Sequence, residues 1–213
     1  MRFRISGGLL QDGIVVGNAY DKYGSRNPVV RWIMRGFNDT LNSLVEKTTP
    51  KTIHEIGCGE GYLVLGWSRQ GITARGSDFS SNVIELARVN AVELGISPDV
   101  FEVRSIYEME PGRDSADLVV CCEVLEHLER PEEGLRALQR IASRYVIVSV
   151  PREPIWRLLN MARGKYLADF GNTPGHIQHW SRDNFVHLVE HYFDIIDVRS
   201  PLPWTMLLCR ARA

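Results

Sequence analysis

The chain has 213 residues, enough for one domain with a substantial core, and 44% of them are hydrophobic while 24% are charged. Its formal net charge of −1 gives no electrostatic basis for binding nucleic acid or an anionic membrane surface. No apolar run approaches the about 20 residues of a membrane-spanning helix, so we expect no membrane span.

Residues 1–27 carry turn formers and little periodicity, and we expect them to form an arm. From Pro28, which suits the first turn of a helix, hydrophobic periodicity predicts alternating helices and strands. Asn82 and Glu85 have the spacing of a helix cap and its reciprocal partner. The expected elements, in chain order, are a helix at 28–47, a strand at 52–56, a helix at 61–70, a strand at 72–77, a helix at 81–94, strands at 100–103 and 117–122, a helix at 132–143, a strand at 145–150, a short helix at 155–162, a helix at 182–191 after the cap Ser181, and strands at 193–199 and 204–211.

This alternation predicts an α/β fold with a doubly wound, mostly parallel sheet. The unbroken apolar strand at 117–122 is typical of a strand buried on both faces of such a sheet. The last two strands are joined too briefly for a crossover helix, so they must be antiparallel.

The cysteines indicate a reducing compartment. Cys58, Cys121, Cys122 and Cys209 form no Cys-x-x-Cys pair, and three of them fall in expected core strands or in a glycine-rich turn. The first residues also lack the apolar region of a secretory signal. We therefore expect reduced thiols and a cytoplasmic protein.

Three glycines at alternate positions, Gly57, Gly59 and Gly61, stand between an expected strand and an expected helix. Glycine adopts backbone angles that other residues avoid, and it lets a ligand lie against the main chain. Asp78 follows about twenty residues after the first glycine, the separation expected for a carboxylate that binds ribose hydroxyls. The pattern predicts a cofactor that contains adenosine.

An acid, Glu55, precedes the glycines, so the sequence reads acid-x-Gly-x-Gly-x-Gly. This resembles motif I of the class I S-adenosylmethionine-dependent methyltransferases, in particular the group with small-molecule acceptors. Asp78, the stretch at 117–128 and the stretch at 131–135 follow in that family's order. The resemblance covers roughly residues 50–150 and, more loosely, 176–210. It implies a Rossmann-like sheet of seven strands with helices on both faces.

The resemblance also implies S-adenosylmethionine as cofactor and S-adenosylhomocysteine as product. Glu55 would orient the methionine end or brace the loop, Asp78 would bind the ribose, and Phe79 would lie along the adenine. The backbone amides of Ser105 and Ile106 would meet the adenine amine, and Tyr20 and Tyr23 would close over the cofactor from the arm. The expected cofactor-binding set is Tyr20, Glu55, Gly57, Cys58, Gly59, Gly61, Asp78, Phe79, Ser105, Ile106 and Glu123.

The expected reaction is transfer of a methyl group to a small molecule, most often to an oxygen, by in-line displacement. His176 and His179 are candidate general bases, because imidazole titrates near neutral pH. Glu123 ends the fourth strand and would face the methionine moiety or the acceptor. The whole chain, 1–213, is expected to be a single domain, monomeric or a homodimer, with 1–47 as a lid and 151–180 as an insertion on the substrate side.

Three different functions stay open beside this one. Glu123, Glu126, His127 and a later histidine resemble the metal-binding set of the small-RNA 3′-terminal 2′-O-methyltransferases, which implies metal-assisted RNA methylation as the first of them. The same residues, with His176, could instead hold a metal in a small-molecule enzyme. Metal-free relatives share this stretch and the chain has no basic patch, so we expect no metal ligand and no nucleic-acid partner. The second is a non-catalytic module that binds S-adenosylmethionine, and the third is a nicotinamide-dependent oxidoreductase.

Overall fold

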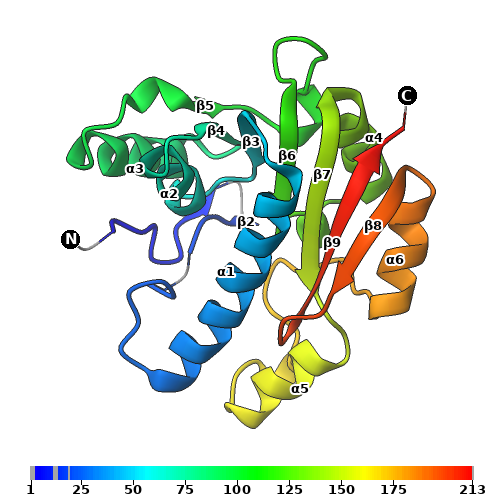
Figure 1. Cartoon of the computed structure of the whole chain (residues 1–213). Helices are drawn as coiled ribbons and strands as arrows, with labels where there is room; N and C mark the ends of the chain where they lie inside the picture. Colours follow the sequence, from blue (N-terminus) through cyan, green and yellow to red (C-terminus); the bar gives the residue numbers. More distant parts are fainter. Residues whose placement is uncertain (1–2, 12–13, 19, 213) are drawn as a thin grey trace.

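The computed structural model describes residues 3–11, 14–18 and 20–212. Its centre is a seven-stranded sheet in the order β5-β4-β3-β6-β7-β9-β8 (Figure 1). Neighbouring strands are parallel except where β9 is involved, since β9 runs antiparallel to both β7 and β8. The strands are β3 (Thr52–Ile56), β4 (Thr73–Asp78), β5 (Phe101–Val103), β6 (Ala116–Cys122), β7 (Ala142–Pro151), β8 (Phe193–Arg199) and β9 (Trp204–Ala211). The predicted sheet with its antiparallel last strand is confirmed.

Helices cover both faces of this sheet, as predicted (Figure 1). In the central strand β6, Leu118 and Val120 belong to a core cluster with α1, α2 and α3, whereas Val119 and Cys121 belong to a second cluster with α4 and α6. Successive side chains of a strand point to opposite faces, so one apolar strand supplies both cores. The helices are α1 (Pro28–Thr48), α2 (Tyr62–Arg69), α3 (Ser81–Glu93), α4 (Pro131–Ile141), α5 (Ile155–Ala162) and α6 (Arg182–Glu190).

Side-chain caps fix where several helices begin. Asn27 caps α1, and the predicted cap of α6 by Ser181 is confirmed. The predicted cap of α3 by Asn82 is wrong. Ser80 takes that position, and its Oγ accepts from the backbone N–H of Val83 at 3.3 Å. The helix therefore begins one residue before Asn82, because a serine oxygen reaches the N–H three residues on.

Two segments lie at the carboxyl edge of the parallel strands. The arm before α1 contains a short antiparallel hairpin, β1 (Leu10–Gln11) and β2 (Ile14–Val15). The segment after β7 carries α5 beyond the end of that strand (Figure 1). No helix in the described ranges combines the length and the apolar composition needed to cross a membrane. The arrangement brings both segments to the edge at which such sheets bind ligands.

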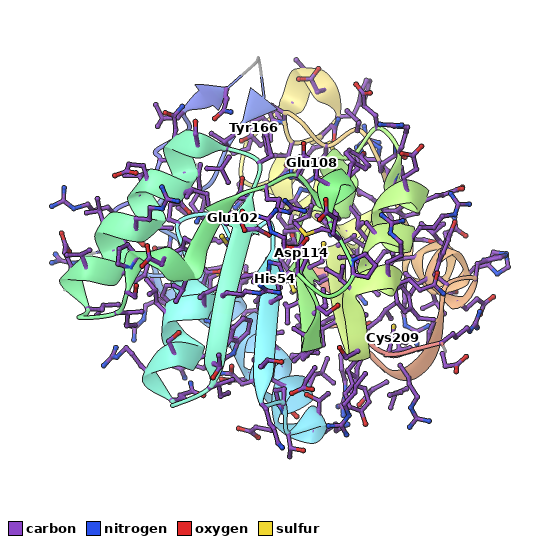
Figure 2. The ribbon with its side chains drawn as sticks, turned by 90° about the horizontal axis from the view of Figure 1, so that it is seen from above. His54, Glu102, Glu108, Asp114, Tyr166 and Cys209 are labelled. Carbon is purple, nitrogen blue, oxygen red and sulfur yellow. The ribbon has the colours of Figure 1, made fainter. Side chains whose placement is uncertain are left out.

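Inside the sheet, a buried polar network supports β3 beneath this edge. Nδ1 of His54 lies 2.8 Å from the carbonyl oxygen of Asp114, and Nε2 lies 3.0 Å from Oγ of Ser77. A carbonyl only accepts, so Nδ1 carries the proton and Nε2 accepts from the serine hydroxyl. His54 and Asp114 are neighbours near the centre of Figure 2, and the Asp114 carboxylate pairs with Arg104 at 3.1 Å. Burial lowers the pKa of His54 to about 4, so the ring is neutral in the folded protein.

Candidate functional site

A cavity of about 490 Å³ lies at the carboxyl edge of the sheet, between the arm and the ends of β3, β4 and β6. Its volume is within the range of small-molecule and cofactor pockets. Most of the predicted site residues line it: Glu55, Gly57, Cys58, Gly59, Asp78, Phe79, Ser105, Ile106 and Glu123. Gly61, Tyr20, His176 and His179 are not part of its lining.

The three glycines of the loop have positive φ, but their surroundings differ. A Cβ at Gly57 would collide with Val124, and a Cβ at Gly61 would collide with the ring of Phe101. A Cβ at Gly59 would meet no atom within 4 Å. Gly57 and Gly61 are therefore required for packing, whereas Gly59 exposes its backbone to the cavity, where a ligand can lie against it.

Asp78 connects the loop to the start of α3. One carboxylate oxygen accepts from the backbone N–H of Gly59 at 3.1 Å, and the other accepts from Ser80 at 3.0 Å. Burial raises the pKa of Asp78, while these backbone hydrogen bonds oppose the rise. Each oxygen has a second lone pair, so the carboxylate can also accept from hydroxyl groups in the cavity. Phe79, which follows it, lines the cavity with its ring partly exposed.

Glu55, at the other side of the loop, is buried, and its Oε2 has no hydrogen-bond partner among the described residues. Burial raises the pKa of Glu55 well above its usual range, and the charge of Asp78 adds to the rise. A buried carboxylate without a partner is unfavourable unless a cation or a donor reaches it. The cavity therefore has an acidic end suited to a positively charged group.

Ser105 and Ile106 lie where the third predicted strand ends, and both reach the cavity. The backbone N–H of Ser105 donates to the carboxylate of Glu108 at 3.1 Å, and Oγ of Ser105 accepts from the N–H of Tyr107 at 3.3 Å. In this capping box the backbone amide of Ser105 already has a hydrogen-bond partner within the protein. A ligand at this wall would meet the apolar side chain of Ile106 and the hydroxyl of Ser105.

Glu60, inside the glycine loop, is a residue that sequence reasoning missed. Its Oε1 accepts from the backbone N–H groups of Ser6 at 3.0 Å and Asn18 at 2.7 Å, and its Oε2 accepts from the Asn18 side chain. Its own carbonyl accepts from the side chain of Asn90 at 3.0 Å. These bonds fasten the arm over the cavity. No local sequence signal marks them, because every partner lies 30 or more residues away along the chain.

The two tyrosines of the arm have different surroundings. Tyr23 lines the cavity and stacks on Tyr62, with ring centroids 3.6 Å apart. Tyr20 is 52% exposed and lies outside the lining. Lys22, next to Tyr23, contributes the positive side chain of the arm to the cavity. The arm thus closes the cavity through Tyr23 and Lys22.

Glu123 ends β6 with a φ of 60°, a conformation that few residues other than glycine adopt. One carboxylate oxygen accepts from Oγ of Ser149 at 3.1 Å, and the other accepts from Nε1 of Trp204 at 2.5 Å. Burial raises the pKa of Glu123 to about 7, against the opposing charge of Lys22 and these hydrogen bonds. The side chain is therefore held rigidly at the cavity wall, with a pKa near neutrality.

The two predicted histidines lie behind this wall. His176 is buried. Its ring stacks on Trp156, with ring centroids 5.6 Å apart, and lies edge-on to His127, with ring centroids 4.9 Å apart. Burial, together with His127, lowers the pKa of His176 to about 3. His179 is bonded through Nε2 to the side-chain oxygen of Asn172 at 2.8 Å. Of the three predicted catalytic residues, only Glu123 lines the cavity.

Beside Glu123, donor atoms of Glu126, His127 and His176 all lie within 4.8 Å of one another. His127 lines the cavity, and the other two lie behind it. A carboxylate and two imidazoles are the ligands that many divalent transition metals prefer. Of the four residues expected from the resemblance, three therefore lie together: Glu126, His127 and His176, which is the later histidine.

Comparison with known proteins gives one family. The profile of the family described as "Methyltransferase domain" matches residues 30–193. The chain is 29% identical over 157 residues to a ubiquinone biosynthesis O-methyltransferase of Cupriavidus pinatubonensis, covering 66% of this chain and 61% of that one. It is 32% identical over 120 residues to the enzyme of that name from Aeromonas salmonicida, covering 55% and 50%. The match thus spans less than two thirds of these curated relatives.

Among solved structures, the fold is similar to that of magnesium protoporphyrin IX methyltransferase from Synechocystis PCC 6803, crystallised with S-adenosylhomocysteine. The TM-score is 0.67 at 19% identity, and the match covers 91% of this chain and 94% of that one. At this identity the likeness concerns the fold alone. It agrees with the Rossmann-like sheet that the sequence predicts.

Proposed function

The chain belongs to the methyltransferase domain family, and from that membership we propose that it transfers the methyl group of S-adenosylmethionine to an oxygen of a small-molecule acceptor. The observation that carries the proposal is the cavity itself. It joins the open backbone at Gly59 to the buried carboxylates of Glu55 and Asp78. A nucleoside that carries both hydroxyls and an ammonium group matches these three features.

In this proposal each end of the cofactor has its own carboxylate. Asp78 accepts from the ribose hydroxyls, and Glu55, with its unpartnered oxygen, receives the amino group of the methionine moiety. Phe79 and Ile106 contact the adenine. The arm, fastened by Glu60 and closing through Tyr23, excludes water from the reacting atoms. Residues 1–47 then act as the lid and the single domain extends over 1–213.

The acceptor would occupy the part of the cavity next to Glu123. Tyr107, Val124 and Leu128 make this part largely apolar, and Arg130 lies over the ring of Tyr107 at 5.0 Å. Such a wall suits an aromatic or otherwise apolar molecule with one hydroxyl to be methylated. The names of the relatives, ubiquinone biosynthesis O-methyltransferases, support an oxygen as the acceptor atom.

The reaction needs few catalytic groups from the protein. S-adenosylmethionine supplies an electrophilic methyl group, and its leaving group is a neutral thioether. The acceptor oxygen forms the new O–C bond as the S–C bond breaks, and the acceptor proton passes to a base. Glu123, whose pKa of about 7 suits proton transfer near neutral pH, is the group at the cavity wall that we assign to take it. S-adenosylhomocysteine is the product.

Two further assignments belong to the proposal. The four cysteines are free thiols, which a reducing compartment permits, so we assign the protein to the cytoplasm. The near-neutral overall charge gives no support to a nucleic-acid substrate, and we propose none.

Transfer of a tritiated methyl group from S-adenosylmethionine to a panel of phenols and catechols tests the proposal. We expect product with at least one phenolic acceptor and a large loss in the Asp78→Asn variant. If S-adenosylhomocysteine binds but no phenol or catechol is methylated, the proposed acceptor class is wrong, and the same assay with amines and thiols then separates another acceptor from a non-catalytic binding module. If only NAD binds, the chain is an oxidoreductase.

A further inference from the structure

The turn after β6 and the segment after α5 are fastened to each other beside the cavity. The backbone N–H groups of Ile177 and Gln178 both donate to the carbonyl of Glu126, each at 3.0 Å. The side chain of Gln178 donates to the carbonyl of Leu128 at 3.1 Å, across 50 residues of chain. These bonds hold His176 at a fixed position next to Glu126, although the two residues are far apart in the sequence.

Glu126 is only 1% exposed, and neither of its carboxylate oxygens has a hydrogen-bond partner among the described residues. Buried polar groups in folded proteins are almost always satisfied, and an orphaned carboxylate is among the most unfavourable exceptions. The position therefore lacks a positively charged partner.

His127 offers one nitrogen in a defined state. Its Nδ1 lies 2.8 Å from the carbonyl oxygen of Gly175, so Nδ1 carries the proton and Nε2 keeps its lone pair. Metal-bound histidines are commonly oriented by such a bond from the second ring nitrogen.

We propose that Glu126, His127 and His176 bind a divalent transition-metal cation at the wall of the cavity. Their donor atoms all lie within 4.8 Å of one another, so one cation placed between them can reach all three after small side-chain movements. Two imidazoles and one carboxylate suit Zn²⁺, Mn²⁺, Fe²⁺ or Co²⁺ better than Mg²⁺ or Ca²⁺, which prefer oxygen ligands.

We do not count Glu123 among the ligands, because the donor atoms that lie within 4.8 Å of one another are those of Glu126, His127 and His176, and the Glu123 carboxylate accepts from Ser149 and Trp204. Three protein ligands leave coordination positions open, and His127 places the cation next to the acceptor part of the cavity. There it would lower the pKa of a bound acceptor hydroxyl. This catalytic role rests on the proposed function, but cation binding does not. The assignment replaces the sequence-based expectation of no metal ligand.

Titration of chelator-treated protein with Co²⁺, followed by calorimetry and by visible absorption, tests the site. We expect one cation per chain, with affinity at least tenfold weaker in Glu126→Gln and in His176→Ala. Glu126→Gln keeps the size of the side chain and should fold well, so it decides the question even if His176→Ala does not fold. Equal affinity of the wild type and Glu126→Gln, or no stoichiometric binding to the wild type, would overturn the proposal.

A matched control separates this site from adventitious binding at the surface. His187, on α6, has a side chain that is 74% exposed and lies against His191, the residue after that helix, so this pair is a competing place for Co²⁺. We expect His187→Ala to keep the tight site. Loss of binding in His187→Ala, with retention in Glu126→Gln, would place the cation at the surface. S-adenosylhomocysteine should bind Glu126→Gln as tightly as it binds the wild type. If it binds neither protein, the proposed function fails, but the cation site can still be correct.

Discussion

Replacing two loop glycines by alanine should separate folding stability from cofactor affinity, because one variant should lose mainly stability and the other mainly affinity. Gly59→Ala and Gly61→Ala both place alanine at positive φ, 53° and 84° respectively, which costs about 1–2 kcal/mol. At Gly61 the new methyl group would also collide with the ring of Phe101, and overpacking of that kind costs about 1–3 kcal/mol more. We therefore expect Gly61→Ala to lose about 2–5 kcal/mol of stability and Gly59→Ala about 1–2 kcal/mol.

Cofactor affinity should follow the reverse order. Gly59 faces open space in the cavity, and its new methyl group would occupy the position where the ligand meets the backbone. We expect S-adenosylhomocysteine to bind Gly59→Ala at least tenfold more weakly, which corresponds to about 1.4 kcal/mol. Gly61 is not part of the cavity lining, so the folded fraction of Gly61→Ala should bind nearly as the wild type does.

Urea unfolding followed by circular dichroism gives the stabilities, and calorimetry gives the affinities. A double-mutant cycle isolates the steric part, because Phe101→Leu should recover about 1–2 kcal/mol in the Gly61→Ala background and none in the Gly59→Ala background. Unchanged binding by Gly59→Ala would refute the reasoning, because it would mean that the ligand does not occupy the space next to Gly59. Equal stability of the two variants would refute the packing argument.

Three further outcomes are expected. Asp78→Asn should weaken S-adenosylhomocysteine binding at least tenfold in calorimetry, because the ribose loses a charged acceptor, and unchanged affinity would remove Asp78 from the site. Glu60→Gln should release the arm, which limited proteolysis would detect as faster cleavage before residue 27, and equal cleavage rates would contradict the anchoring role. The pKa of His54 is about 4 in the folded protein and about 6.5 when unfolded, so the contribution of His54 to stability is full above pH 6.5 and falls by up to roughly 3 kcal/mol as the pH drops to about 4. Urea titrations across this range should show a smaller loss for His54→Gln, and an identical pH dependence would exclude His54 as the cause.

The sequence predicted much of the cavity lining around the glycine loop because its signals are local. Gly57, Gly59 and Asp78 are read from spacing along one strand, one turn and the next strand, and parallel strands bring such residues to one edge. The sheet could be predicted for the same reason, since each strand is marked by its own apolar run. Where the prediction of a cap failed, at Asn82, an equally good cap two residues earlier was already in place.

The rest could not be predicted because it depends on contacts between distant segments. Trp204 reaches Glu123 across 81 residues of chain, and no pattern in either segment marks the pair. His176 could be recognised as a candidate base, but its burial against Trp156 and its position beside Glu126 follow from backbone hydrogen bonds in an irregular segment.

The central claim is that this cavity binds S-adenosylmethionine and its product. Calorimetric titration of metal-free, dialysed protein with S-adenosylhomocysteine, and separately with NAD, tests it most directly. The account predicts one S-adenosylhomocysteine per chain at micromolar or tighter affinity and no heat from NAD. Binding of NAD without binding of S-adenosylhomocysteine would contradict it.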